Sequence, residues 1–159
     1  MEPSPKKSRK PSAGLPARPP EAPVFFIDRD TGGRLLAAAL RPHGFRVELH
    51  DSHFRQETKD REWIREVARR GWAILTCDRN IARKEPERSL FSAAPTHTFI
   101  LYALSHVQRE QRVPLVLAVL PKISALVASG APHGIYRVHT DGKIEHLTNI
   151  KARFRLEDF

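Results

Sequence analysis

Apolar positions between residues 24 and 147 follow two alternating patterns. Short continuous apolar runs, which are typical of strands buried on both faces, alternate with stretches in which apolar residues recur at helical spacing. We expect strands at residues 24–27, 45–49, 72–76 and 96–102. Two further strand patterns, 135–138 and 144–147, flank Asp141-Gly142, which predicts a β-hairpin. The alternation predicts an α/β fold, a three-layer α/β/α sandwich with a mainly parallel central sheet.

Helical spacing of apolar residues lies between these strands. We expect helices at residues 35–40, 58–71 and about 114–128, with a polar loop at residues 50–58. Thr58 or Asp60 is expected to be the N-cap of the second helix, because both side chains accept hydrogen bonds from free amides. Pro114 is expected in the first turn of the third helix, where its missing N–H costs nothing.

Composition divides the chain into three parts. Residues 1–22 are rich in Pro, Lys, Arg and Ser, and we expect them to form a disordered basic tail. Residues 23–148 are expected to form one domain, followed by a C-terminal extension at residues 149–159. The single cysteine, Cys77, excludes an internal disulfide and suits a reducing cytoplasm. No continuous apolar run approaches membrane-spanning length, so we expect no membrane partner.

The charge balance changes the picture of the partners. The chain has 27 Lys and Arg against 18 Asp and Glu, a formal net charge of +9 and a pI near 10.3. The tail contributes only part of this excess, so the domain itself is basic. Such a surface attracts polyanions through phosphate contacts, which makes RNA a candidate partner. The alternative is a charge surplus that only keeps the protein soluble.

Three aspartates are placed where a ligand would bind in such a fold. Asp28 follows the first strand and Asp78 follows the third, while Asp60 opens the helix that begins after the second strand. Ligands of parallel sheets bind beyond the carboxyl ends of the strands, so the three side chains should meet at one edge. Clustered carboxylates repel one another unless a cation neutralises them, and oxygen ligands suit Mg²⁺ or Mn²⁺. Arg29, Arg79, Arg83 and Lys84 are the expected phosphate-binding residues around this site.

Other interpretations of the same residues remain open. Each aspartate could instead cap a helix. The eight histidines, especially His50 and His53, suggest zinc, but the sequence shows no second pair at ligand spacing. Asp28-Arg29-Asp30-Thr31 is similar to the Asp-x-Asp-x-Thr start of haloacid-dehalogenase-type phosphatases, although the expected threonine position holds Gly32.

The order of these pieces resembles the PIN-like domain family, and within it the VapC-type toxin ribonucleases of toxin–antitoxin pairs. The resemblance rests on four segments, which read FFIDRDTGGRLLAAALRPHGFRVELHDSHF, TKDREWIREVARRGWAILTCDRNIARKEPER, LPKI and IYRVHTDGKIEHL. The specific part is the succession of a strand ending in Asp, a helix opening Asp-x-x-Trp and a strand ending Thr-x-Asp.

This resemblance implies metal-dependent cleavage of RNA phosphodiesters. Asp28, Asp60 and Asp78 fall at the acidic positions of the family, and Thr76 matches a hydroxyl that supports the site. A fourth acid is frequent two positions after the last aspartate, where this chain has Asn80, whose side-chain carbonyl oxygen can bind a metal ion but brings no charge. Glu57, Glu85 and Glu87 are the candidates to replace it. The family relationship also implies an antitoxin partner and a homodimer.

The hypothesis is therefore a Mg²⁺- or Mn²⁺-dependent endoribonuclease, the toxin of a VapBC-type pair. The alternative is a non-catalytic RNA-binding or regulatory module with the same basic surface, and a minor alternative is a phosphatase. Fold-level resemblance does not by itself decide among these functions.

Overall fold

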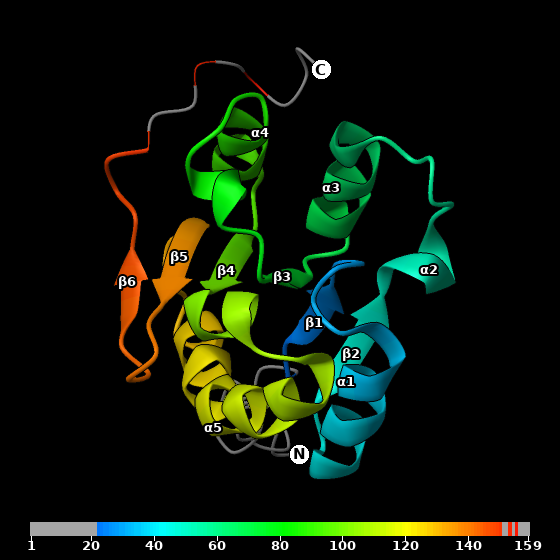
Figure 1. Ribbon diagram of the computed structural model, residues 1–159. Coiled ribbons are helices and arrows are strands. Elements are labelled where there is room, and N and C mark those ends of the chain that lie inside the picture. The colour runs from blue at the N-terminus through cyan, green and yellow to red at the C-terminus, as the bar shows by residue number, and fades with distance from the viewer. Residues whose placement is uncertain (1–21, 151–152, 154, 156–159) are drawn as a thin grey trace, which may run out of the picture.

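The computed structural model describes residues 22–150, 153 and 155 (Figure 1). Its strands are β1 (Val24–Ile27), β2 (Arg46–Leu49), β3 (Ala73–Thr76), β4 (His97–Leu101), β5 (Gly134–Val138) and β6 (Ile144–His146). Its α-helices are α1 (Gly33–Leu40), α2 (His50–His53), α3 (Asp60–Arg69), α4 (Glu87–Ala93) and α5 (Arg109–Ala128). Three short 3₁₀ helices complete the order, η1 (Arg41–His43), η2 (Arg79–Ala82) and η3 (Tyr102–His106).

The six strands form one sheet in the order β2-β1-β3-β4-β5-β6. The strands β1 to β5 pair in parallel, and β6 alone runs antiparallel, beside β5. The predicted mainly parallel sheet and the predicted hairpin are therefore confirmed. Because β2, β1 and β3 are neighbours, the residues that follow these three strands emerge side by side at one edge of the sheet.

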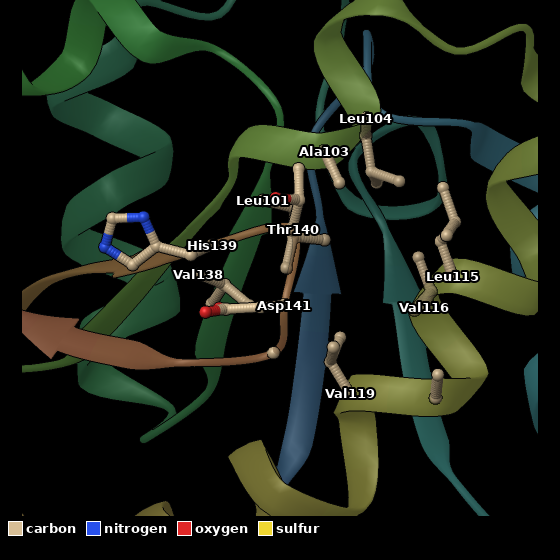
Figure 2. Close-up of a pocket in the computed structure, with 12 residues that line it drawn as sticks. Leu101, Ala103, Leu104, Leu115, Val116, Val119, Val138, His139, Thr140 and Asp141 are labelled. Carbon is tan, nitrogen blue, oxygen red and sulfur yellow. The ribbon is translucent and has the colours of Figure 1, made fainter.

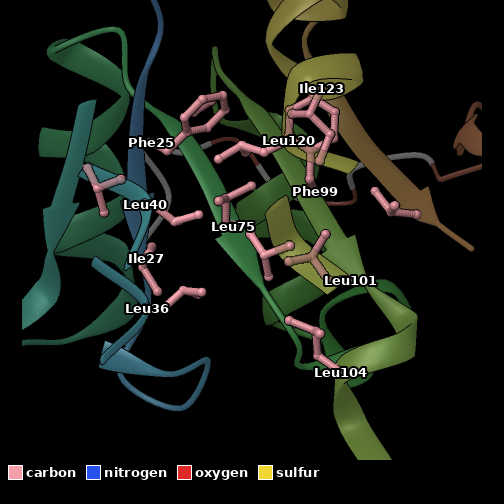
Figure 3. Packing of buried hydrophobic residues seen from close by; sticks show 14 of the residues in the cluster. Phe25, Ile27, Leu36, Leu40, Leu75, Phe99, Leu101, Leu104, Leu120 and Ile123 are labelled. Atoms are coloured by element: carbon pink, nitrogen blue, oxygen red, sulfur yellow. The ribbon is translucent and has the colours of Figure 1, made fainter. Parts of the chain in front are cut away.

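Helices cover both faces of the sheet, so the predicted three-layer arrangement is confirmed. Figure 1 shows α1 and α5 on one face and α3 and α4 on the other. Alternate strand residues fill the space beneath each layer. Phe25, Ile27, Leu75 and Phe99 join the core under α1 and α5, which Figure 3 shows with Leu120 of α5.

The strand residues that alternate with Phe25, Ile27, Leu75 and Phe99 pack on the opposite face of the sheet. Phe26, Ile74 and Ile100 are completely buried in the core under α3 and α4. The same period of two places Asp28 on the Phe26 side of β1 and Thr76 on the Ile74 side of β3. Strand pleating therefore directs both polar side chains toward α3 and α4.

Several local expectations need correction. The predicted polar loop at residues 50–58 begins with the short helix α2, and α4 forms in a segment for which we expected no helix. The N-cap of α3 is Lys59, so neither Thr58 nor Asp60 has that position. Asp60 is instead the first residue of the helix, where a carboxylate interacts favourably with the helix dipole.

The helix α5 begins five residues before Pro114, which lies inside it. The extra turn carries Arg112, whose guanidinium donates to the carbonyls of Asp30 and Thr31 at 2.9 and 2.8 Å. This tertiary contact favours a helical turn that propensity alone does not require. By length and composition only, α5 is also apolar enough to cross a membrane, a criterion that helices of a protein core meet as well. In the structure it packs on the sheet through Val116, Leu120 and Ile123.

The two terminal segments are described only in part. The predicted disordered tail at residues 1–22 lies outside the described residues, except for Ala22. Of the C-terminal extension, Ile150 packs against the core under α3 and α4, and its carbonyl accepts a hydrogen bond from Ser92 of α4 at 3.2 Å.

Candidate active site

A polar pocket of about 150 Å³ opens at the carboxyl ends of β1 and β3, on the side of α3 and α4. Its lining contains Asp28, Arg29, Asp30, His50, Asp60, Trp63, Asp78, Ile81, Glu87 and Phe91. The three aspartates predicted from the sequence therefore meet at one pocket. We call it the acidic pocket.

The best-held carboxylate of the acidic pocket is that of Asp28. Thr31 donates to one of its oxygens at 2.5 Å, and Thr76 donates to the other. Both threonines are completely buried. Burial raises the pKa of Asp28 above its ordinary value, against the lowering effect of the two hydroxyls, and the nearby Asp30 raises it further. The two hydroxyls therefore fix both oxygens of Asp28 at the pocket.

The Thr-x-Asp end of β3 has a physical reason. Thr76 donates to Asp28 and accepts from the amide of Asp78 at 3.1 Å, so one hydroxyl links two of the acids. The side chain of Asp78 caps η2 by accepting from the amide of Asn80 at 2.9 Å. Asp78 is thus both a helix cap and a residue of the pocket, two roles that the sequence left as alternatives.

The Asp-x-x-Trp start of α3 is explained in the same way. The indole N–H of Trp63 donates to the carboxylate of Asp60 at 2.9 Å, one helical turn away. The Trp63 ring is buried and stacks on Phe26, with ring centroids 5.3 Å apart. A residue of the core therefore orients Asp60 toward the pocket.

His50 lines the acidic pocket, whereas the sequence named it, with His53, only as a candidate for a zinc site. It follows β2 directly, just as Asp28 follows β1, and only 2% of it is exposed. Neither ring nitrogen has a hydrogen-bond partner. The strand and helix periods in the sequence do not predict that His50 lies in this pocket, because they do not show which strands are neighbours.

The four predicted phosphate-binding residues separate in space. Arg29 lines the acidic pocket, and its guanidinium donates to the carbonyl of Gln56 at 2.6 Å. Arg79 donates to the carbonyl of Tyr102 at 2.7 Å and lies over its ring, so its side chain is directed away from the pocket. Arg83 lines a different pocket beside β6, and Lys84 is exposed after η2.

The candidates for a fourth acidic residue separate as well. Asn80 is exposed and does not line the acidic pocket, whereas Glu87 at the start of α4 does. Glu85 instead pairs with Arg88 at 2.9 Å, and Glu57 lines the neighbouring pocket that contains Lys59. Of these candidates, Glu87 is therefore the one that lines the acidic pocket, which also contains Asp30, an acid that the sequence analysis did not propose for the site.

The side chains surround the acidic pocket without forming a tight cage. Within residues 22–150, 153 and 155, no group of three or more His, Cys, Asp or Glu residues is arranged so that it could hold a metal ion. The pocket is large enough for several water molecules, which could bridge an ion to these oxygens.

Comparison with protein families agrees with this geometry. The sequence model described as "PIN like domain" matches residues 23–103, more than half of the chain. The chain belongs to the PIN-like domain family. Comparison with curated proteins and with solved structures gives no significant match. PIN-like domains are often nucleases, so the protein carries a nuclease-type module.

The match covers the strands β1 to β4 and every residue that lines the acidic pocket. A second pocket, of about 180 Å³, lies on the opposite face of this PIN-like domain, between η3, α5 and the hairpin of β5 and β6 (Figure 2). Its walls are mainly aliphatic, with Leu101, Leu104, Val116 and Val119 among them. Figure 2 shows the ring of His139 turned away from these side chains. We call this second pocket the apolar pocket.

Proposed function

We propose that this PIN-like protein is a metal-dependent endoribonuclease. The observation that carries the proposal is the acidic pocket, where Asp28, Asp60, Asp78 and Glu87 surround one polar space in a chain of this family. Family membership supports a nuclease-type module, and the pocket chemistry supports the metal.

The donor set fits Mg²⁺ or Mn²⁺. Hard divalent ions prefer carboxylate oxygens and retain several waters, so they do not require a closed cage of protein ligands. Asp28, Asp60, Asp78 and Glu87 would hold the ion. When bound, the ion would polarise a phosphodiester oxygen and make a bound water more acidic.

The protein's own residues would position these parts. Thr31 and Thr76 fix Asp28, and Trp63 fixes Asp60, so the oxygens stay in place without rearrangement. Arg29 at the pocket wall is placed to contact a phosphate of the RNA chain. The net charge of +9 would draw RNA to the surface and make binding sensitive to salt.

The decisive experiment compares the wild-type protein with Asp78→Asn on labelled single-stranded and structured RNAs. Asn can cap η2 as Asp does, so the variant should fold, but it removes one charged oxygen ligand. We expect cleavage that needs Mg²⁺ or Mn²⁺, stops with a chelator and falls at least ~100-fold in the variant. Asp141→Asn, which removes a carboxylate at the apolar pocket, is the matched control and should cleave normally. Equal turnover by wild type and Asp78→Asn would refute the proposal.

A non-catalytic RNA-binding module is the second candidate. It is favoured by the lack, within the part of the chain that the structure describes, of three side chains arranged to hold a metal directly. This function predicts salt-sensitive RNA binding with no products under either metal. The family match argues against the phosphatase alternative, which the Asp-x-Asp sequence alone suggested.

We further propose that the protein is a cytoplasmic toxin with an antitoxin partner, and that it forms a homodimer. The sequence resemblance to VapC-type toxins supports this part. Arginines of the antitoxin would pair with the pocket aspartates and block the site. Wild type and Asp78→Asn also test the toxin role. Wild type produced without an antitoxin should stop bacterial growth, and Asp78→Asn should not. Normal growth with active wild-type enzyme would contradict the toxin role.

A further inference from the structure

The acidic pocket contains one imidazole side chain, that of His50. It occupies the end of β2, beside the ends of β1 and β3 from which Asp28 and Asp78 reach the pocket. Only 2% of the residue is exposed, and both ring nitrogens are buried without a hydrogen-bond partner. Asp51 lies 3.6 Å from Nδ1, which is too far for a hydrogen bond.

An unpartnered imidazole is costly in this environment. The ring lies among Phe26, Phe54 and Trp63, at centroid distances of 5.5 to 6.1 Å, and none of these aromatic faces replaces water as a partner for nitrogen. A neutral imidazole has one N–H donor and one lone-pair acceptor, and burying either unpaired costs about 1–3 kcal/mol. A ligand in the pocket would remove this cost.

Other histidines of the described chain do have partners. His53, three residues away on α2, lies 2.7 Å from a Glu48 oxygen. His97 lies 2.7 Å from the carbonyl of Ala131, and His139 lies 2.9 Å from Glu145. Among the buried side-chain nitrogens and oxygens of the described residues, the unpartnered histidine nitrogens are those of His50, which lines the acidic pocket.

We propose that His50 is a nitrogen ligand of the ion in the acidic pocket, and that it makes the site prefer Mn²⁺ to Mg²⁺. This inference rests on the proposed metal-dependent nuclease function. Mg²⁺ is bound almost entirely by oxygen, whereas imidazole suits the first-row transition metals. A single nitrogen donor among carboxylates therefore shifts affinity toward Mn²⁺ without excluding Mg²⁺.

The test measures binding of Mn²⁺ by electron paramagnetic resonance, with Mg²⁺ as a competitor and without RNA. In wild type we expect tighter binding of Mn²⁺ than of Mg²⁺, and nitrogen-14 modulation of the manganese signal in pulsed experiments. His50→Phe should lose the modulation and about 10–100-fold of Mn²⁺ affinity, with a smaller loss for Mg²⁺. Phe suits the aromatic surroundings, so this variant should keep the fold.

Two further variants complete the design. His50→Gln gives a polar alternative if His50→Phe folds poorly. The nitrogen-14 modulation of the manganese signal is measured on wild type, so that part of the test does not depend on any variant. His53→Gln is the matched control, because His53 lies on the same helix but pairs with Glu48 and does not line the pocket. It should retain the modulation and the preference for Mn²⁺.

The outcomes separate this inference from the function on which it rests. Tight Mn²⁺ binding that needs Asp78 but shows no nitrogen modulation would overturn the role of His50 and leave the metal-dependent nuclease intact. Binding of neither Mn²⁺ nor Mg²⁺ by wild type would overturn both.

Discussion

The two faces of the sheet carry pockets of similar size and opposite chemistry. The acidic pocket lies under α3 and α4 at the ends of β1 and β3, and the apolar pocket lies under α5 at the ends of β4 and β5. On the apolar side the side chains at the strand ends, Leu101 and Val138, remain part of the core. On the acidic side the side chains at the ends of β1 and β3 are instead those of Asp28 and Thr76, which are hydrogen-bonded to each other.

This difference separates the part of the molecule that stabilises the fold, the apolar core, from the part that carries the candidate function, the acidic pocket. Apolar side chains buried on either face stabilise the fold by leaving water. A buried carboxylate with a raised pKa and an unpartnered histidine both oppose folding. The acidic pocket thus lowers the stability of the fold, and a bound cation would offset this cost.

The largest expected effect is on the apolar face. Leu120 of α5 is completely buried, and Leu120→Ala should lower the free energy of unfolding by about 2–5 kcal/mol through lost burial and a cavity. Leu115 of the same helix is 38% exposed, so Leu115→Ala should cost clearly less. Urea unfolding of both variants measures the contrast. Equal losses would mean that α5 does not pack on the sheet as described.

An intermediate effect on stability and metal affinity is expected when the hydroxyl of Thr76 is removed, in comparison with that of Thr98. Thr76→Val removes the link between Asp28 and Asp78, and should lower stability by about 1–3 kcal/mol and metal affinity about 10–100-fold. Thr98 on the neighbouring strand β4 is equally buried, but its hydroxyl has no partner. Thr98→Val should therefore be neutral or stabilising. Calorimetry of unfolding and of Mn²⁺ binding tests the pair, and a larger loss from Thr98→Val would contradict the assigned hydrogen bonds.

The smallest effect concerns pH. Because the pKa of Asp28 is raised in the folded protein, folding is favoured below the ordinary value of 3.8 and loses this contribution as pH rises through the folded pKa. Asp28→Asn lacks this loss, so in the presence of a chelator it should be more stable than wild type at neutral pH and similar near pH 3. Adding Mn²⁺ should stabilise wild type and not the variant.

Unfolding in denaturant across this pH range gives the difference directly. Asp141→Asn is the control for removing one negative charge, since Asp141 is exposed on the hairpin and its substitution should change stability by less than about 0.5 kcal/mol. A variant Asp28→Asn that is less stable than wild type at neutral pH would show that burial of this carboxylate is not a cost.

Much of the fold and half of the site could be predicted because local patterns determine them. The continuous apolar runs predicted the buried strands, and their ends located Asp28, Thr76 and Asp78. The parallel order of α/β folds then placed Asp60 at the same edge. The predicted start of α5 was wrong, because the contacts of Arg112 with the distant residues Asp30 and Thr31 favour an extra turn that local propensity does not require. The helix α4 was missed, because its segment shows no clear helical pattern.

By itself the sequence determined the class of fold, the faces on which alternate strand residues lie, and three acids at one edge, since each follows from periods of two and 3.6 residues. Tertiary structure alone decided that His50 and Glu87 join these acids while Arg79 and Arg83 do not. The order β2-β1-β3 brings His50 beside Asp28, and α4 reaches the pocket from a segment with no pattern of its own. Strand neighbours and helix placement are set by packing over the whole domain, which no local spacing encodes.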